Sequence, residues 1–308
     1  MGVDLVTIAR LIAEMPDREI RLDALRADLR EKPTPIDVLM TRGGDTSVTE
    51  IQIDALRLDQ MNSLLDTHFP CSDRIVCGVP EQIEPFMMDA IPNLVVSDMD
   101  STMIGQECID ELADYAGIKD QIALITERAM QGEIDFEDAL RERVALLAGL
   151  EESAIARCLE ERIRPNPGAV ELIRALKAKG ARTVLVTGGF HHFADRVAQQ
   201  IGFDRVVGNR LAVKDGKLTG ELDGPVSDAT TKASVLAEET ARLGEGAVSL
   251  ALGDGANDIP MIEAATYGIA YMAKPKAKAA ADGRIESGNL ASVLALLGVD
   301  TGQYKKGF

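Results

Sequence analysis

Two aspartates separated by one residue follow a short apolar run in VVSDMDST, residues 95–102. Carboxylates this close repel each other, so the pKa of one should rise unless a cation or hydrogen bonds intervene. A single spacer residue in an extended segment points both side chains, Asp98 and Asp100, to the same face. The pair therefore indicates a metal or catalytic site, with an ordinary acidic turn as the alternative.

A second acidic group lies much later in the chain, in GDGAND at residues 253–258. It offers the side chains of Asp254, Asn257 and Asp258. The carboxylate oxygens of Asp98 and Asp254 are hard ligands, which suit Mg²⁺ far better than softer ions. Zinc is disfavoured because the three histidines, two of them adjacent, offer no ligand spacing. We therefore expect Mg²⁺ as the cofactor.

Donors for an anion lie between these two acidic groups. In TGGF, residues 187–190, glycines such as Gly188 let backbone N–H groups approach an oxyanion, and Thr187 adds a hydroxyl donor. Lys232 can neutralise phosphate charge as a movable cation. A metal, an anion-binding backbone, a cation and a nucleophile are what phosphoryl transfer needs. Taken alone, paired glycines usually mark a turn, and a single lysine is usually a solvated surface residue.

The elements that must position these residues are short apolar runs: NLVVSD, ARTVLVTGG, AVSLALGDG and YGIAYMA. Helical patterns separate them, as in residues 167–180, where Val170, Ile173 and Leu176 recur at helical spacing. Strands that alternate with helices predict a parallel sheet flanked by helices. In such open sheets ligands bind beyond the carboxyl ends of the strands. The polar residues at those ends should therefore share one site.

Roughly eighty residues separate the first two of these strands, far more than one crossover helix needs. The segment is rich in helical pattern, so we interpret residues 105–165 as a helical insertion that could cap the site. Further along, residues 211–222 alternate around Asp215 and Gly216 and predict a β-hairpin with a type I′ turn.

Residues 1–88 have a different pattern, which mixes an amphipathic helical pattern with short strand-like runs and contains no catalytic motif. Prolines at positions 80, 85 and 92 suggest a domain boundary near them. We expect an N-terminal α+β domain over residues 1–88 and an α/β domain that carries all the motifs over residues 89–300.

The composition restricts the partners and the location. The formal net charge is −17, from 33 basic and 50 acidic residues, which disfavours nucleic acid and anionic membranes as partners. No stretch approaches the ~18 apolar residues that a membrane span needs. Four cysteines without a CxxC pair, in a chain long enough to fold without disulfides, indicate reduced thiols and a cytoplasmic protein.

DMDST, TGGF, the lysine of TK and GDGAND occur in the order and spacing of the haloacid dehalogenase (HAD) superfamily of phosphatases, and the resemblance covers residues 93 to about 297. It implies a Rossmann-like HAD core, with Asp98 as the nucleophile and Asp100 as general acid and then base. It also implies further site residues. Thr187, Gly188 and Lys232 would hold the phosphoryl oxygens. Mg²⁺ would sit on Asp98, the Asp100 carbonyl and Asp254. Asn257 would lie on the substrate side, and Asp258 would support the site.

Within the superfamily, the insertion is most similar to that of the phosphoserine phosphatases. Glu107 stands nine residues after Asp98, and TERAMQGEIDFEDALRERVALL resembles that family's cap. The resemblance implies that Glu107 pairs with the substrate ammonium, that Arg143 pairs with its carboxylate, and that Met130 and Phe136 wall the pocket. The residues alone allow other interpretations: Glu107 could cap or solvate a helix start, Arg143 could belong to an exposed charged face, and Met130 and Phe136 could be cap core.

The function implied by this resemblance is the Mg²⁺-dependent hydrolysis of O-phospho-L-serine, the last step of L-serine biosynthesis. The alternative is a HAD phosphatase or phosphotransferase for another small phosphomonoester. The sequence has Thr187 where many phosphoserine phosphatases have serine, and the extra methyl could tighten the pocket. Some members carry ACT-like domains with a βαββαβ pattern. Residues 1–88 are compatible with one, so an amino-acid-sensing module is a second hypothesis, and a homodimer is left open.

Overall fold

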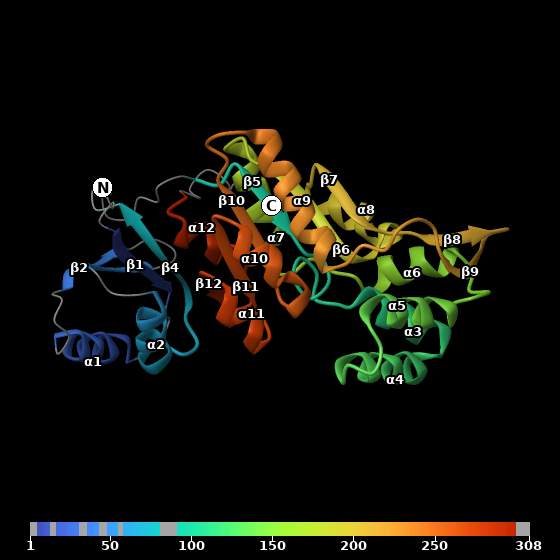
Figure 1. Cartoon of the computed structure of the whole chain (residues 1–308), viewed down its shortest axis with the longest axis horizontal. Helices are drawn as coiled ribbons and strands as arrows, with labels where there is room; N and C mark the ends of the chain where they lie inside the picture. Colours follow the sequence, from blue (N-terminus) through green and yellow to red (C-terminus); the bar gives the residue numbers. More distant parts are fainter. Residues whose placement is uncertain are drawn as a thin grey trace.

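The structure is a computed structural model that describes residues 5–12, 17–30, 36–42, 48–54, 58–80 and 91–299. Figure 1 shows three parts along the long axis: a small α+β part formed by N-terminal residues, a central α/β part, and a helical part at the opposite end. One ten-stranded sheet runs through the first two parts, in the order β2-β3-β1-β4-β12-β11-β10-β5-β6-β7. Among the described residues, no helix is long and apolar enough to cross a membrane.

The central part contains the parallel portion of this sheet. Its strands are, in spatial order, β12 (Gly283–Ile285), β11 (Tyr267–Tyr271), β10 (Ser249–Gly253), β5 (Leu94–Ser97), β6 (Arg182–Phe190) and β7 (Arg205–Asn209). Within this group, adjacent strands pair in parallel. All residues of β5 and β10 are buried, as expected when helices cover both faces of a parallel sheet. The predicted Rossmann-like α/β core is confirmed.

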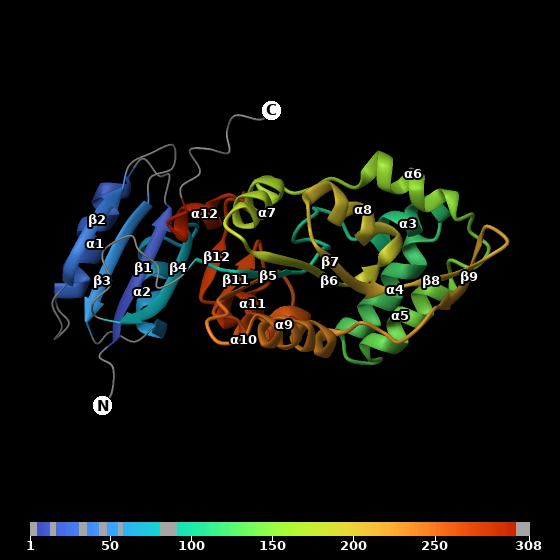
Figure 2. The same ribbon diagram turned by 90° about the horizontal axis from the view of Figure 1, so that it is seen from above.

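Helices cover the two faces of this sheet. On one face lie α7 (Ala169–Ala178), α8 (His191–Ile201) and α12 (Ser292–Leu296), and on the other α9 (Ala229–Leu243) and α10 (Ile259–Ala264), as Figure 2 shows. The apolar clusters follow the alternation of the strands. Val95 of β5 belongs to the cluster that contains Phe193 of α8, whereas Val96 belongs to the one that contains Leu236 of α9 and Met261 of α10.

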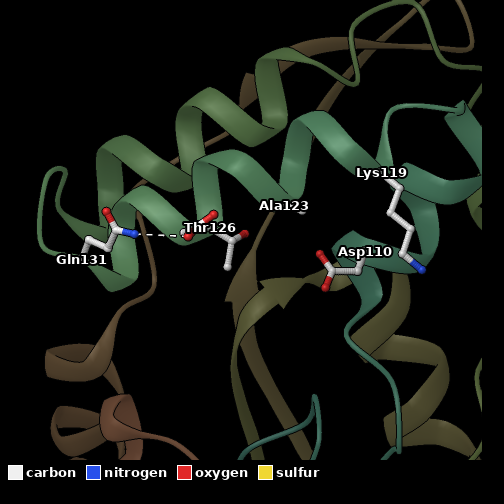
Figure 3. A pocket seen from close by; sticks show the side chains of 6 residues that line it. Asp110, Lys119, Ala123, Thr126 and Gln131 are labelled. Atoms are coloured by element: carbon white, nitrogen blue, oxygen red, sulfur yellow. Dashed lines mark hydrogen bonds between the residues drawn. The ribbon is translucent and has the colours of Figure 1, made fainter.

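Four helices form most of the part at the far end. They are α3 (Cys108–Ala116), α4 (Lys119–Met130), α5 (Phe136–Ala145) and α6 (Ser153–Arg162), which occupy the segment predicted as a helical insertion. A cavity of about 420 Å³ opens along α3 and α4. Figure 3 shows Asp110 of α3 beside the face of α4 that carries Lys119, Ala123 and Thr126. We call this segment, residues 105–165 with its four helices, the cap.

The hairpin predicted over residues 211–222 is formed by β8 (Leu211–Lys214) and β9 (Lys217–Leu222). Asp215 and Gly216 have φ angles of 50° and 74°, as a type I′ turn requires. The hairpin is bonded to the cap: the backbone N–H of Gly149 donates to the Leu218 carbonyl, and that of Leu218 donates to the Leu150 carbonyl, both at 2.8 Å. This attachment was not predicted from the sequence.

The N-terminal part has the element order βαββαβ. Its elements are β1 (Leu5–Ile12), α1 (Arg18–Arg30), β2 (Ile36–Arg42), β3 (Val48–Asp54), α2 (Leu58–His68) and β4 (Asp73–Pro80). The strands pair antiparallel, and the two helices cover one face through a cluster that includes Leu11, Leu22 and Leu65. An α+β pattern in this region was expected.

The antiparallel and parallel portions of the ten-stranded sheet are joined by β4 and β12, which pair antiparallel with Arg74 opposite Arg284. The Asp73 carboxylate adds to the joint, because it accepts hydrogen bonds from the backbone N–H groups of Glu286 at 2.7 Å and Ser287 at 2.8 Å. The division expected between residues 88 and 89 falls in residues 81–90, outside the described residues, as does the end expected at residue 300.

Candidate active site

Asp98 follows β5 directly, and its carboxylate is buried beside a buried lysine. Asp98 Oδ1 lies 2.6 Å from Lys232 Nζ, and the same nitrogen lies 2.7 Å from Asp258 Oδ1. Lys232 belongs to α9 and is only 1% exposed. The interpretation of Lys232 as a solvated surface lysine is therefore wrong. Its ammonium group is a fixed cation between two carboxylates.

The titration of these groups follows from their burial. Burial raises the pKa of Asp98 well above its usual value, and Asp258 adds to the rise, whereas Lys232 opposes it. Burial alone would lower the pKa of Lys232, but Asp98 and Asp258 raise it above its usual value. Lys232 is therefore charged at neutral pH. Asp98 and Asp258 share the single ammonium group of Lys232. A further cation would therefore favour the ionised form of both carboxylates.

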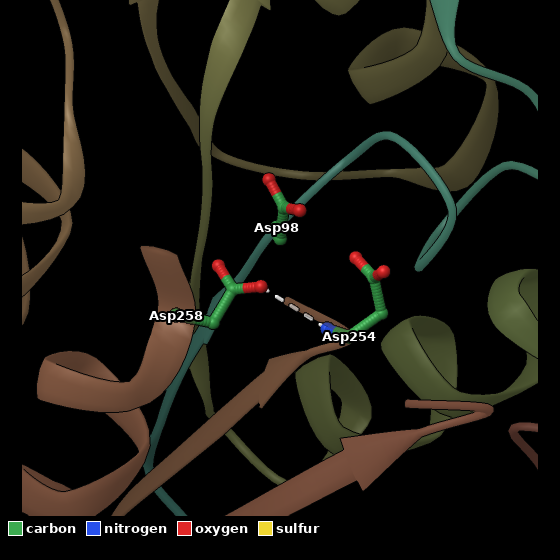
Figure 4. A group of neighbouring side chains, drawn as sticks. All are labelled: Asp98, Asp254 and Asp258. Carbon is green, nitrogen blue, oxygen red and sulfur yellow. Dashed lines mark hydrogen bonds between the residues drawn. The ribbon is translucent and has the colours of Figure 1, made fainter. Parts of the chain in front are cut away.

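A third carboxylate, that of Asp254, follows β10 and joins this group. Carboxylate oxygens of Asp98, Asp254 and Asp258 all lie within 4.8 Å of one another (Figure 4). Burial, with Asp258 and Glu107 adding to it, raises the pKa of Asp254 to about 6. Three hard oxygen donors at this spacing fit a divalent cation such as Mg²⁺. The structure thus brings together the two carboxylates predicted as ligands, and it adds the one predicted to support them.

Asp258 is held in place by the loop that carries Asp254. Its Oδ2 accepts hydrogen bonds from the backbone N–H groups of Asp254 at 3.1 Å and Gly255 at 2.9 Å. A Cβ atom at Gly253 would lie only 2.4 Å from the Asp258 Cβ, so only glycine fits there. Asn257 lies in the adjoining 3₁₀ helix Ala256–Asp258, with its Oδ1 close to Gly255. Glycines in GDGAND therefore serve the packing of Asp258 and Asn257.

Asp100 meets the end of the neighbouring strand β6. Its Oδ1 accepts a hydrogen bond from the Cys108 N–H at 3.0 Å, and the Thr187 hydroxyl donates to its Oδ2 at 3.4 Å. A Cβ atom at Gly189 would lie 2.7 Å from Asp100 Oδ2. Burial, followed by the negative charge of Glu107, raises the pKa of Asp100 to about 7. A carboxyl group that titrates near neutral pH can both donate and accept a proton.

Two residues that the sequence did not single out support the β6 end. The Asn209 side chain donates to the Gly188 carbonyl at 2.7 Å and accepts from the Ser227 N–H at 2.8 Å. The Ser227 hydroxyl donates to the Thr187 carbonyl at 3.0 Å. Both supporting side chains are buried. Asn209 could have been found, because it is also a polar residue at the end of an apolar run, RVVGN. Ser227 carries no such signal.

Glu107 and Arg143 approach this group from the cap. Glu107 is the residue before α3, but its side chain makes no helix-capping hydrogen bond and instead accepts one from the Ser101 hydroxyl at 2.7 Å. The capping interpretation is therefore wrong. Arg143 is half-buried, and burial lowers its pKa, although the charges of Asp110 and Glu107 partly oppose this shift. Its Nε donates to the Ala139 carbonyl at 3.2 Å, so it is not a member of an exposed charged face.

Phe136 is the contact between the cap and the β6 end. A Cβ atom at Gly188 would lie 3.2 Å from the ring of Phe136, although the side chain is still 41% exposed. Phe136 and Val226 also line a cavity of about 540 Å³ between the cap and the core. Phe136 is therefore not plain cap core. Met130 ends α4, and its side chain lies outside the part of the chain that the structure describes.

Comparisons with known proteins agree with this geometry. Residues 95–263 match the haloacid dehalogenase-like hydrolase family. A phosphoserine phosphatase of Albidiferax ferrireducens is 46% identical over 209 residues, which cover 66% of this chain and 88% of that protein. A HAD family hydrolase of Salmonella enterica serovar Typhi has a TM-score of 0.79 at 26% identity and covers 95% of this chain and 98% of its own. A phosphoserine phosphatase solved as a phospho-aspartyl intermediate analogue has a TM-score of 0.61 at 38% identity, over 67% of this chain and 99% of its own.

Proposed function

We propose that this chain, which belongs to the haloacid dehalogenase-like hydrolase family, hydrolyses O-phospho-L-serine to L-serine and inorganic phosphate. The observation that carries the proposal is the position of Glu107 between the aspartates of the core and Arg143 of the cap. On the core side, its negative charge adds to the effect of burial in raising the pKa values of Asp100 and Asp254, and on the cap side it opposes the lowering of the Arg143 pKa by burial. A carboxylate and a guanidinium beside a phosphoryl-transfer cluster suit a substrate that carries an ammonium and a carboxylate. Relatives named phosphoserine phosphatase support this choice.

The chemistry proceeds in two displacements. The Asp98 carboxylate attacks phosphorus while the ester bond breaks, and Asp100 gives its proton to the departing serine oxygen. Asp100, now ionised, takes a proton from the water that attacks the aspartyl-phosphate, which releases inorganic phosphate and restores Asp98. Asp98, the Asp100 carbonyl and Asp254 would hold Mg²⁺, which neutralises phosphate charge when bound. Asp258 orients Lys232 and the loop that carries Asp254.

The substrate contacts divide between the core and the cap. On the core side, Thr187, Gly188 and Lys232 bind the phosphoryl oxygens, with Asn257 beside them. On the cap side, Glu107 binds the ammonium and Arg143 binds the carboxylate, for which a bidentate guanidinium is well suited. Phe136 and Met130 wall the space between. In the same proposal the enzyme is cytoplasmic and completes L-serine biosynthesis.

Residues 1–88 would form a separate ACT-like domain with a regulatory role, followed by the catalytic domain over residues 89–300. The βαββαβ order and the antiparallel order β2-β3-β1-β4 support this second proposal. Calorimetry of the whole chain with L-serine tests it. The wild type is compared with Arg143→Ala, which lacks the guanidinium proposed to bind serine in the cap. Heat of binding that persists in the Arg143 variant would support a site outside the cap.

Phosphate release from a panel of small phosphomonoesters tests the main proposal. The panel contains phosphoserine, phosphothreonine, phosphoethanolamine and an ester without an amino group, each measured with Mg²⁺ and then with a chelator. A metal-dependent kcat/KM that is far higher for phosphoserine is the expected result. A metal-dependent but flat profile would favour the alternative of a phosphatase for another small ester.

A further inference from the structure

Ser101 has a backbone conformation that a serine rarely adopts. Its φ angle is 54°, and the other non-glycine residues with positive φ among those described are Asp215 and Met272. Asp215 sits in a hairpin turn that demands this conformation. Glycine would adopt it at Ser101 without strain. A side chain kept at a strained position next to Asp100 indicates that the side chain has a use.

The hydroxyl of Ser101 has one partner, the carboxylate of Glu107. Ser101 Oγ donates to Glu107 Oε1 at 2.7 Å. Two further hydrogen bonds flank it: the Ser101 N–H donates to the Gln106 carbonyl at 3.3 Å, and the Cys108 N–H donates to the side-chain Oδ1 of Asp100 at 3.0 Å. These three bonds fasten the turn at Asp100 and Ser101 to the start of α3.

Without Ser101, little would hold the Glu107 side chain. It is exposed and makes no helix-capping hydrogen bond. In the described part of the chain, no lysine or arginine forms an ion pair with it. A long, exposed side chain loses rotamer freedom when it binds a ligand, and ordering it in advance reduces that cost. The bond from Ser101 orders this carboxylate before the substrate arrives.

We propose that Ser101 is a positioning residue for substrate selectivity: its hydroxyl holds the Glu107 carboxylate ready for the ammonium group of the substrate. The inference rests on the proposed function, because it needs a substrate that carries an ammonium. Asp100 and Ser101 share one turn, so the ammonium is bound at a fixed distance from the group that transfers the proton. Ser101 touches no reacting atom, and its effect should therefore fall on KM and spare kcat.

Ser101→Gly tests the inference, because it removes the hydroxyl and at the same time relieves the strained φ. We expect KM to rise about ten-fold for phosphoserine and for phosphoethanolamine, which both carry an ammonium. KM for the phosphate ester of hydroxypropionate, which has the carboxylate and no ammonium, should not change. The kcat values for all three esters should stay within about two-fold. Ser101→Ala, which keeps the strained φ, should also raise KM for the two esters with an ammonium and leave kcat and the third KM unchanged.

Asp215→Gly is the matched control, because it relieves a positive φ in the exposed hairpin turn, away from the site. It should leave all three KM values unchanged. Calorimetry with L-serine adds a measurement without turnover: binding should weaken about ten-fold in Ser101→Gly. An unchanged KM for phosphoserine, equal rises for all esters, or a fall in kcat alone would each overturn the role of Ser101. A wild-type enzyme that does not prefer esters with an ammonium would instead overturn the proposed function, and this inference with it.

Discussion

The core side of the candidate site is buried and densely bonded, whereas its cap side is more exposed and has few bonds. Lys232 and Asp258 are at most 1% exposed and are connected by a 2.7 Å ion pair. On the cap side, Phe136 is 41% exposed, and Arg143 makes a hydrogen bond to the backbone of its own helix. Both sides meet at the same carboxyl edge of the sheet, so the contrast does not come from their place in the fold.

The contrast reflects two different tasks. Stabilising charge that develops during phosphoryl transfer requires groups fixed in advance in a water-poor site, and the core provides them at the cost of burying charges. Binding the rest of the substrate requires groups that stay solvated until it arrives, and the proposed function assigns that task to the cap. Core substitutions that leave a buried charge unpaired should therefore affect catalysis and folding together, and substitutions in the cap should affect substrate choice alone.

The largest expected effect is that of Asp98→Asn, which keeps the shape of the side chain and removes the nucleophile. The kcat for phosphoserine should fall by about 10⁴-fold or more. The fold should persist, because an amide at this position no longer carries a buried negative charge. Phosphate release and a thermal melt measure the two properties. A variant that releases phosphate at a near-normal rate would refute Asp98 as the nucleophile.

Lys232→Met should reduce both activity and stability, because the buried core depends on the charge of this side chain. It leaves Asp98 and Asp258 buried without their shared cation, which should cost about 3 kcal/mol or more of unfolding free energy. Loss of the cation should also lower kcat by about 10²- to 10³-fold. Denaturant unfolding and steady-state kinetics measure the two effects.

Lys278→Met is the matched control for this prediction. Lys278 pairs with Glu286 at 2.8 Å at a more exposed position, and none of the described ion pairs joins it to the aspartate cluster. Its loss should cost less than about 1 kcal/mol. A similar cost for both variants would show that the core cluster is not special.

The core side of this contrast was largely predictable from the sequence. Asp98, Thr187 and Asp254 each follow an apolar run, and β10, β5 and β6 are neighbours in a parallel sheet. The apolar runs, together with the rule that ligands bind beyond the carboxyl ends of parallel strands, therefore sufficed to predict that these residues share one site. The same rule applied to RVVGN would have added Asn209.

Other features depend on contacts between ordinary residues far apart in the sequence, and no local pattern marks them. The pairing of β4 with β12 and the attachment of the 211–222 hairpin to the cap are backbone contacts of this kind. The left-handed φ of Ser101 was hidden for a different reason, because the residue is not the glycine that such a conformation favours. The roles of Glu107 and Arg143 came from family resemblance, and they remain predictions.

Arg143→Ala tests the cap side. Loss of charged hydrogen bonds to the substrate carboxylate should raise KM for phosphoserine by about 10²-fold. KM for phosphoethanolamine, which lacks the carboxylate, should change little, and the unfolding free energy should fall by less than about 1 kcal/mol. Steady-state kinetics with both esters and a denaturant melt measure these properties.

Arg128→Ala is the control on the neighbouring helix, because Arg128 is 43% exposed and pairs with Glu142 on the cap surface at 2.8 Å. It should alter neither KM. Equal rises for both esters in Arg143→Ala would remove the carboxylate-binding role, and a large loss of stability would contradict the separation of tasks.

The smallest expected effects compare a carboxylate of the core with one of the cap. The Asp204 carboxylate accepts from Lys177 Nζ at 2.6 Å and from the N–H and hydroxyl of Thr183 at 2.9 and 3.0 Å. Burial opposes ionisation, but these hydrogen bonds outweigh it and hold the pKa of Asp204 below 3.8. Asp204→Asn should cost about 1 kcal/mol at pH 7.

Because the pKa of Asp204 is lower in the folded state, its contribution is complete above about pH 4 and is lost as the pH falls through the folded value. The deficit of Asp204→Asn should therefore shrink below about pH 4, which urea unfolding at several pH values can measure. Glu151 pairs with Lys217 at 3.0 Å on the cap surface, where both side chains are more than half exposed. Glu151→Gln should change stability by less than about 0.5 kcal/mol at any of these pH values. If it costs as much as Asp204→Asn, the cap is bonded as tightly as the core, and the contrast between the two sides of the site does not hold.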